Sequence, residues 1–305
     1  MSRPDESLTH ALAAGPLVLD GGLATELERR GHDLSGSLWS AQVLRDDPSE
    51  VVAAHRAFVE AGARVVETAS YQASFEGLAA AGLDADQTRA LLRRSVELAR
   101  DASGDEPVWV AASVGPYGAA RADGSEYTGA YADELDVTAL RLFHRERLRV
   151  LADAGADVLA LETVPCVAEA QALVEEAELV GVPAWLSLTT VTTPDGRVLT
   201  RRGERAEAAF AVARDSAAVV AVGVNCTDPI RVPAAVRLAA RISGKPVVVY
   251  PNSGESWDAR ARAWTGPARF DPLDVEDWAR AGARLVGGCC RVTPDAIAGL
   301  AAALA

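Results

Sequence analysis

The stretch "RAGARLVGGCC" at 280–290 has two partial copies, "EAGARVVETAS" at 60–70 and "DAGADVLALET" at 153–163. Each copy holds a helix end, a glycine suited to a helix C-cap, and a short apolar run typical of a buried strand. Ala-Gly-Ala is also a common helix terminus in an alanine-rich chain. The copies therefore support a repeating helix-and-strand unit but do not settle the fold by themselves.

Short β-branched runs bounded by Gly, Pro or Asp predict eight strands. They lie at 16–20, 64–70, 108–114, 157–163, 184–190, 219–226, 246–252 and 284–289. Stretches with helical apolar spacing separate them, and most are continuously apolar, as parallel strands covered on both faces are. These units predict an α/β fold, a (β/α)8 TIM-type barrel over 15–305 with an N-terminal extension at 1–14. A doubly wound open sheet is the alternative, but "DGGLATE" after the first strand lacks the G-x-G-x-x-G spacing.

Composition narrows the class of protein. The 305 residues are 49% hydrophobic and carry a formal net charge of −13, without a block of Lys or Arg. This argues against nucleic acid or an anionic membrane as the main partner. The first fifteen residues lack the apolar core of a signal peptide, so we expect a cytoplasmic protein. Four cysteines in so long a chain are too few for a disulfide scaffold and favour thiols or metal ligands.

Polar and thiol side chains follow six of the predicted strands. Because catalytic residues of such barrels come from the carboxyl ends of strands, these side chains are candidates for a site. The candidates on which the interpretation rests are Asp20, Gly21, Thr68, Tyr71, Glu162, Asn225, Cys226, Cys289 and Cys290.

The cysteines after strands six and eight predict a metal site. Cys226, Cys289 and Cys290 come from two even-numbered strands, whose ends converge in a barrel, and three thiolates suit zinc. The glycines before Cys289 permit close backbone approach. The alternatives are buried small apolar residues or a vicinal disulfide between Cys289 and Cys290. Cys166, at the start of the predicted fourth helix, is a weaker candidate.

Eight motifs carry a resemblance to a known family. They are "LDGGLATELERRG" (19–31), "SLWSAQVL" (37–44), "TASYQAS" (68–74), "SVGPYGA" (113–119), "DGSEYTG" (123–129), "GVNC" (223–226), "VVYPNSGE" (248–255) and "GGCCRVTP" (287–294). In this combination the chain resembles the homocysteine S-methyltransferases, most closely the stand-alone bacterial branch that uses S-methylmethionine. The resemblance implies a barrel with Zn²⁺ on Cys226, Cys289 and Cys290. It also implies an L-homocysteine pocket that includes the carboxylates of Asp20 and Glu162 as partners of the ammonium group.

The expected chemistry is methyl transfer to sulfur. A free thiol has a pKa near 8.5, so bound zinc is needed to favour the homocysteine thiolate at neutral pH. In-line attack on the methyl group of a sulfonium donor, S-methylmethionine or S-adenosylmethionine, then gives methionine. Three alternatives stay open. The first is the same enzyme with glycine betaine as the methyl donor. The second is a barrel that binds zinc or thiols without catalysing a reaction. The third is a metal-assisted aldolase or hydrolase, although such enzymes more often use His and carboxylate ligands.

The donor pocket is harder to place. The segment 115–134 is long for a loop after the third strand and is a candidate lid. Aromatic faces attract sulfonium groups by cation–π interaction, and they equally well pack a loop onto a barrel. The aromatic candidates are Trp39, Tyr71, Tyr117, Tyr127 and Tyr131. The acidic side chains that either bind the charged end of the donor or face water are Asp123, Glu126 and Glu255.

Overall fold

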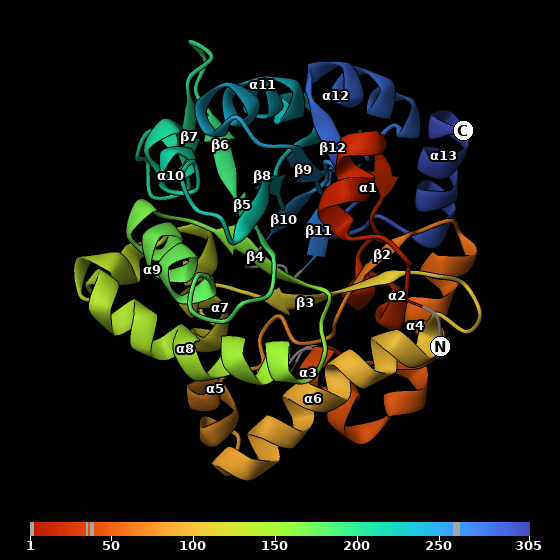
Figure 1. Cartoon of the computed structure of the whole chain (residues 1–305), viewed down its shortest axis with the longest axis vertical. Coiled ribbons are helices and arrows are strands. Elements are labelled where there is room, and N and C mark those ends of the chain that lie inside the picture. Colours follow the sequence, from red (N-terminus) through yellow and green to blue (C-terminus); the bar gives the residue numbers. More distant parts are fainter. Residues whose placement is uncertain (1–2, 35, 37–39, 259–262) are drawn as a thin grey trace.

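The eight predicted strands form one parallel sheet that closes on itself (Figure 1). The computed structural model describes residues 3–34, 36, 40–258 and 263–305. The strands are β1 (Leu17–Val18), β2 (Val65–Glu67), β3 (Trp109–Val114), β4 (Val158–Val164), β5 (Ala184–Leu188), β8 (Val219–Asn225), β9 (Val247–Tyr250) and β12 (Ala283–Val286). Their order is β1-β12-β9-β8-β5-β4-β3-β2. A parallel bridge between Leu19 and Val65 joins the two ends, so the predicted (β/α)8 barrel is confirmed and the open sheet is not formed.

A helix follows each strand and covers the outside of the barrel (Figure 1). These helices are α4 (Pro48–Glu60), α6 (Ala85–Ala102), α8 (Val137–Asp153), α9 (Val167–Ala177), α10 (Ala206–Val212), α11 (Val232–Ser243), α12 (Val275–Ala281) and α13 (Pro294–Leu304). The repeated glycines Gly62, Gly155 and Gly282 follow α4, α8 and α12 with φ of 102°, 88° and 120°. This backbone conformation favours glycine, which explains the motif that recurs before β2, β4 and β12.

Additional elements lie in the loops after the strands. They are α2 (Leu23–Arg29), α3 (Ser40–Asp46), α5 (Phe75–Ala80), α7 (Tyr117–Arg121), η1 (Ser125–Tyr127), η2 (Ala130–Asp133), η3 (Pro229–Arg231), η4 (Pro272–Asp274), the hairpin β6 (Thr190–Thr192) and β7 (Val198–Thr200), and the hairpin β10 (Ser256–Asp258) and β11 (Ala263–Thr265). The two hairpins were not predicted. The long loop predicted after the third strand is present and contains α7, η1 and η2.

The side chains inside the barrel change from apolar to polar along each strand. On β3, Trp109 and Ala111 belong to the buried interior cluster, and Ser113 is the next residue in the same alternation. On β4, Val158 and Ala160 belong to that cluster and Glu162 follows. Because side chains of a strand alternate between faces, the same inward row supplies an apolar floor and a polar top layer.

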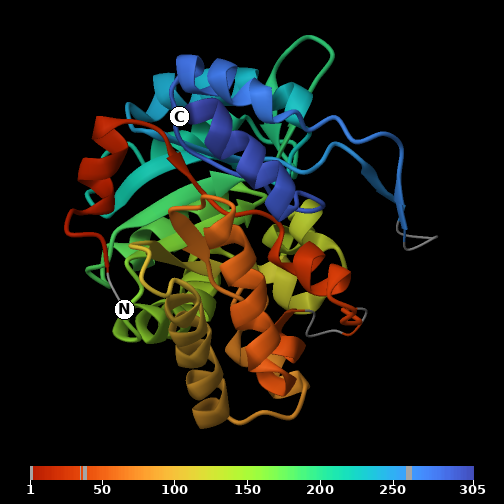
Figure 2. The same cartoon turned by 90° about the vertical axis from the view of Figure 1, so that its right-hand side faces the viewer.

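A helix before the first strand closes the apolar end of the barrel. Helix α1 (Leu8–Ala14) buries Leu8, Ala11 and Leu12 in the interior cluster. In Figure 2, α1 lies at one end of the molecule and the β10–β11 hairpin extends from the other. The stretch 1–14, predicted to precede the barrel, therefore contributes a helix to its interior, while a domain boundary at residue 14 stays a prediction.

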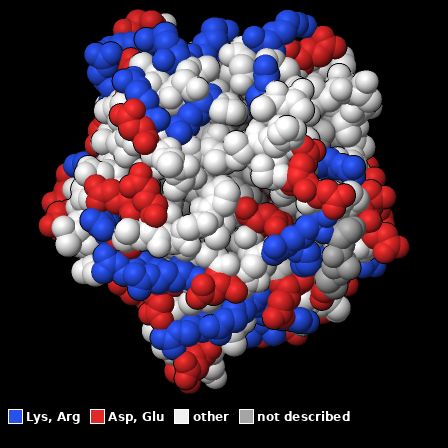
Figure 3. All heavy atoms as spheres, in the orientation of Figure 1, with Lys and Arg blue, Asp and Glu red and all other residues white. Residues whose placement is uncertain are grey.

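Charged side chains of both signs are mixed on the face that carries α1. Figure 3 shows Lys and Arg interspersed with Asp and Glu around the rim of this face, with uncharged side chains at its centre. No broad single-sign patch is visible on this face. None of the helices in the described part of the chain combines the length and the apolar content needed to span a bilayer.

The burial of α1 can be tested by replacing one buried and one exposed residue of the helix. Leu12 is 1% exposed, so Leu12→Ala should lower the free energy of unfolding by about 3 kcal/mol through lost packing and a cavity. Thr9 faces solvent on the same helix, and Thr9→Ala should change it by less than about 0.5 kcal/mol. Urea unfolding of both variants measures the difference. Equal, small effects would show that α1 is not part of the barrel core.

Candidate metal and substrate site

Three cysteine thiols converge at the polar end of the barrel. The sulfur atoms of Cys226, Cys289 and Cys290 lie within 4.8 Å of one another. Cys226 directly follows β8, and the other two lie in the loop after β12. Zinc–thiolate bonds of about 2.3 Å put the sulfurs of a tetrahedral site roughly 3.8 Å apart, and the Cys289 and Cys290 sulfurs are 4.0 Å apart. The donor set and its spacing therefore fit a thiophilic metal such as zinc.

The same geometry decides between the alternatives for the adjacent cysteines. All four cysteines are free, and the 4.0 Å separation of the Cys289 and Cys290 sulfurs is about twice the length of a disulfide bond. Hydrogen bonds from Cys226 and Cys289 hold the pKa of Cys290 well below 9.0, although burial acts in the opposite direction. Hydrogen bonds with Cys226 and Cys290, together with burial, raise the pKa of Cys289. One thiolate is thus favoured beside two thiols.

Two glycines bring the last loop against the first. A Cβ at Gly287 would lie 2.5 Å from the Asp20 carbonyl oxygen, and one at Gly288 would lie 2.1 Å from Cγ1 of Val292. The Gly288 amide also donates to the Asp20 carbonyl at 3.0 Å. Side chains at these positions would push the loop away from β1, so the glycines are required for the approach of Cys289 to the site.

Three carboxyl groups lie at the ends of β1, β2 and β4. Asp20 and Glu162 are 1% and 5% exposed. One Asp20 oxygen accepts a hydrogen bond from the Glu67 amide at 2.9 Å, while its Oδ1 and the Glu67 Oε1 are buried without a partner. Glu162 accepts hydrogen bonds from the Ser113 hydroxyl and, at 3.3 Å, from Asn225 Nδ2. Buried acceptors without donors suit a ligand that brings N–H groups.

Burial and mutual repulsion disfavour ionisation of this cluster. Burial raises the pKa of Glu162 to about 7, hydrogen bonds from Ser113 and Tyr250 lower it, and the negative charge of Cys290 raises it. The pKa of Asp20 is raised well above 3.8, mainly by burial, with a further contribution from the charge of Glu162. A cation that enters the cluster would relieve both effects, because it interacts favourably with the ionised carboxylates.

Asn225 organises the carboxyl cluster rather than facing open space. Its Oδ1 accepts from the Thr163 amide and the Ser187 hydroxyl, both at 2.8 Å. Its Nδ2 donates to Thr163 Oγ1 at 2.7 Å and to Glu162. Thr163 has φ of 58°, a strained conformation for a β-branched residue. The Asn225 amide therefore uses its hydrogen-bonding capacity within the protein, holding the turn after β4 and orienting Glu162.

The remaining predicted pocket residues support this arrangement. Thr68 Oγ1 accepts from the Ser113 amide at 3.0 Å. Burial and then the charges of Glu126 and Cys226 raise the pKa of Tyr71, which places its hydroxyl near the thiols. A Cβ at Gly21 would lie 2.7 Å from Phe58 Cε1, so Gly21 provides close packing after β1.

The aromatic candidates for donor binding fall into two groups. Tyr127 is 37% exposed as a whole, but burial of its hydroxyl raises its pKa, and negative charge on Cys226 and Cys290 raises it further, so it interacts electrostatically with the thiols. Tyr117 and Tyr131 contact each other at 5.2 Å between ring centroids and belong to a separate apolar cluster that contains Cys166.

That separate cluster fixes the long loop to α9. The Tyr131 hydroxyl donates to Glu169, and the Tyr117 amide donates to the same carboxylate at 2.6 Å. Cys166 is fully buried there and is not part of the thiol group. The structure does not bring Tyr117, Tyr131 or Cys166 to the three thiols, and Trp39 lies outside the described residues.

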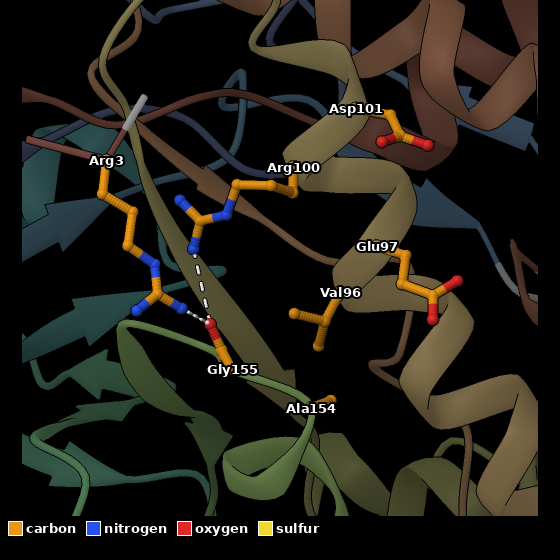
Figure 4. Close-up of a pocket in the computed structure, with 7 residues that line it drawn as sticks. All are labelled: Arg3, Val96, Glu97, Arg100, Asp101, Ala154 and Gly155. Carbon is orange, nitrogen blue, oxygen red and sulfur yellow. Dashed lines mark hydrogen bonds between the residues drawn. The ribbon is translucent and has the colours of Figure 1, made fainter. Parts of the chain in front are cut away.

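One surface hollow away from the thiols is lined by cationic groups with partners inside the chain. A hollow of about 340 Å³ lies between α6 and the turn after α8 (Figure 4). Arg3 and Arg100 both point at the Gly155 carbonyl, and both pair with Asp157. Its cationic groups are therefore already bound within the chain.

Several residues of the site were missed by sequence reasoning. Ser113, Ser187 and Tyr250 line the barrel beside Glu162, but serine and tyrosine in a strand do not stand out. Arg201 follows the unpredicted β6–β7 hairpin and donates to Thr189 at 3.2 Å. The turn signal "TPDG" at 193–196 was available in the sequence and would have indicated this hairpin.

Known proteins are similar to this chain in sequence and in fold. The profile of the family described as homocysteine S-methyltransferase matches residues 17–304. Homocysteine S-methyltransferase 2 of Arabidopsis thaliana is 42% identical, with 93% of this chain and 91% of that protein aligned. Selenocysteine Se-methyltransferase of Brassica oleracea var. italica is also 42% identical, with 93% and 87% aligned.

A solved structure gives the same result. The homocysteine methyltransferase MmuM from Escherichia coli, in its metallated form, superposes with a TM-score of 0.83 at 41% identity, covering 94% of this chain and 96% of that one. A profile match over nearly the whole chain and relatives above 40% identity agree with the thiol site and the barrel. This chain belongs to the homocysteine S-methyltransferase family.

Proposed function

We propose that this protein is a zinc-dependent enzyme that transfers a methyl group from a sulfonium donor to the sulfur of L-homocysteine, forming methionine. The convergence of Cys226, Cys289 and Cys290 within 4.8 Å is the observation that carries the proposal. These three residues would hold Zn²⁺. When bound, the metal supplies an open position that lowers the pKa of a substrate thiol and keeps its sulfur nucleophilic.

The carboxyl cluster would bind the amino-acid end of homocysteine. Asp20 and Glu162 are buried, and Asp20 Oδ1 has no partner among the described residues. An ammonium group supplies three N–H donors and a positive charge, which matches this unpaired acceptor and the repulsion between the carboxylates. Ser113 and Asn225 orient Glu162 by hydrogen bonds. The substrate sulfur would then point toward the thiols, whose charge is close enough to affect Glu162.

The transfer itself needs little acid–base work from the protein. The new bond forms between the homocysteine sulfur and the methyl carbon while the bond from that carbon to the sulfonium breaks. The bonding pair stays on the donor sulfur, which leaves as a neutral thioether, and the thiol proton goes to solvent as homocysteine binds. Tyr71 and Tyr127, which flank the thiols, would exclude water and hold the donor cation against their rings.

Loss of one thiol tests the metal and the reaction together. Cys289→Ala should lose bound zinc and lower methionine formation by at least about 100-fold, more than the loss of an outer-shell partner of a metal typically costs. Cys166→Ala, a matched change of a buried cysteine outside the thiol group, should keep both. Zinc content and methionine formation are measured with S-methylmethionine, S-adenosylmethionine or glycine betaine as the single donor.

The outcomes of this experiment separate the alternatives. Methionine formed by zinc-free Cys289→Ala protein would contradict the metal requirement. Zinc bound at full occupancy without methionine from any donor would favour the non-catalytic barrel. Turnover with glycine betaine alone would assign the other donor class.

The raised pKa of Glu162 predicts a pH dependence of amino-acid binding. The ionised carboxylate binds an ammonium group and the protonated form does not, so affinity should rise with pH until it levels off above about 7. Methionine is a suitable ligand because it has the ammonium group but no thiol that titrates. Below that pKa its Kd should increase by up to about tenfold for each unit of pH.

Calorimetric titrations with methionine at a series of pH values measure this profile. Glu162→Gln should bind methionine weakly and without the step near pH 7. A step that survives unchanged in Glu162→Gln would assign the titration to another group.

A further inference from the structure

One acidic side chain of the long loop has a buried oxygen without a hydrogen-bond partner. Glu126 lies in η1, and its Oε2 is buried without a hydrogen-bond partner. Burial raises the pKa of Glu126, and negative charge on Asp123 and Cys290 raises it further. Burial likewise raises the pKa of Tyr71, and the charge of Glu126 adds to that shift. By contrast, the other two acidic candidates are ion-paired, Asp123 with Arg121 at 2.9 Å and Glu255 with Arg291 at 3.1 Å.

One arginine contacts Tyr127, the residue that follows Glu126. The Arg201 guanidinium lies over the Tyr127 ring, 5.8 Å from its centroid. It donates to Thr189 Oγ1 at 3.2 Å and to the Cys226 carbonyl at 3.5 Å. Among the described residues no carboxylate lies within 4.0 Å of it, whereas Arg202 and Arg205 in the same turn both have acidic partners.

These two charges are complementary and are not paired with each other. Glu126 is the residue before Tyr127, and Arg201 stacks on the Tyr127 ring, so both groups lie on the rim of the thiol site. Leaving a buried carboxylate oxygen without a donor is costly unless a ligand completes it. A guanidinium without a carboxylate partner and a buried carboxylate oxygen without a donor, on residues joined through Tyr127, match the two ends of an amino-acid zwitterion.

We propose that Glu126 binds the α-ammonium and Arg201 the α-carboxylate of the methyl donor, so that the donor is recognised as an α-amino acid. The inference rests on the proposed function. The carboxyl cluster of Asp20 and Glu162 lies deeper in the barrel and takes the ammonium of homocysteine, which leaves the outer pair for the second substrate. Glycine betaine has a carboxylate but no N–H group, so it satisfies only the Arg201 half of this recognition.

A purely structural role for Arg201 makes a different prediction. Its bond to the Cys226 carbonyl supports a residue with φ of 46°, in a conformation that is strained for cysteine. If Arg201 only holds that backbone, its replacement should release zinc and weaken every substrate alike. If it binds the donor, zinc should stay bound and only the carboxylate of the donor should lose its partner.

The test pairs each side chain with the ligand group that it recognises. Binding of S-methylmethionine, its methyl ester and its N-acetyl derivative to the zinc-loaded protein is measured by calorimetry without homocysteine. Wild-type protein should bind each derivative about tenfold to a hundredfold more weakly than the parent, the cost of one charged hydrogen bond. Arg201→Gln should bind the ester and the parent equally, and Glu126→Gln should bind the N-acetyl derivative and the parent equally.

Matched controls and turnover complete the experiment. Arg205→Gln and Glu134→Gln change exposed charges nearby and should behave as wild type. With S-methylmethionine, Arg201→Gln and Glu126→Gln should raise the KM for the donor and leave the KM for homocysteine and the zinc content unchanged.

Each contrary result would overturn a specific part of the proposed donor recognition. Equal binding of parent and derivatives by wild-type protein would refute recognition of the zwitterion, and zinc loss in Arg201→Gln would assign that residue to support of Cys226. If the variants raise the KM for homocysteine instead of the KM for the donor, Glu126 and Arg201 bind homocysteine and not the donor. Donor binding with no methionine formed by wild-type protein would leave this pair intact and reject the proposed function.

Discussion

Closure of the sheet between β1 and β2 is the constraint on which the site depends. The bridge from Leu19 to Val65 completes the ring of strands, and it puts Asp20 beside Glu67, whose amide it binds. On the other side of β1, the Asp20 carbonyl accepts from Gly288 and so fixes the loop that carries the two adjacent cysteines. A single strand end thus connects the carboxyl cluster to the thiols, because parallel strands of a closed barrel end at one rim.

The polar groups at the rim of the barrel lower its stability, and the apolar side chains beneath them offset this cost. Two carboxylates and three thiols within one buried region repel one another when ionised, which is why burial and charge raise the pKa of Asp20 and Glu162. The interior cluster below, sealed by α1, contributes the packing that offsets this cost. Strain at Thr163 and Cys226 is concentrated at the same rim, where the Thr163 amide donates to Asn225 and the Thr189 hydroxyl donates to the Cys226 carbonyl.

Such a site favours cations and soft ligands over other substrates. In the proposed reaction, its anionic groups would be matched by a homocysteine ammonium, a thiophilic metal ion and a sulfonium donor, whose positive charge would be lost as the methyl group moves. Two parts of the long loop have different roles. Tyr127 and Glu126 interact electrostatically with the thiols, whereas Tyr117 and Tyr131 fix the loop to Glu169 on α9. The loop is therefore anchored at a point distinct from the part that faces the site.

The sequence by itself determined the eight strands, the barrel and the three thiols, because these depend on local signals. Strands are marked by β-branched runs, helix ends by glycines such as Gly62 and Gly282, and the metal site by cysteines at strand ends. Only the tertiary structure decided which polar side chains meet. Asn225 and Arg201 are ordinary in sequence, and their roles arise from partners as distant as Glu162 and Tyr127. Contacts between side chains far apart in the chain depend on closure and loop packing, which no local pattern encodes.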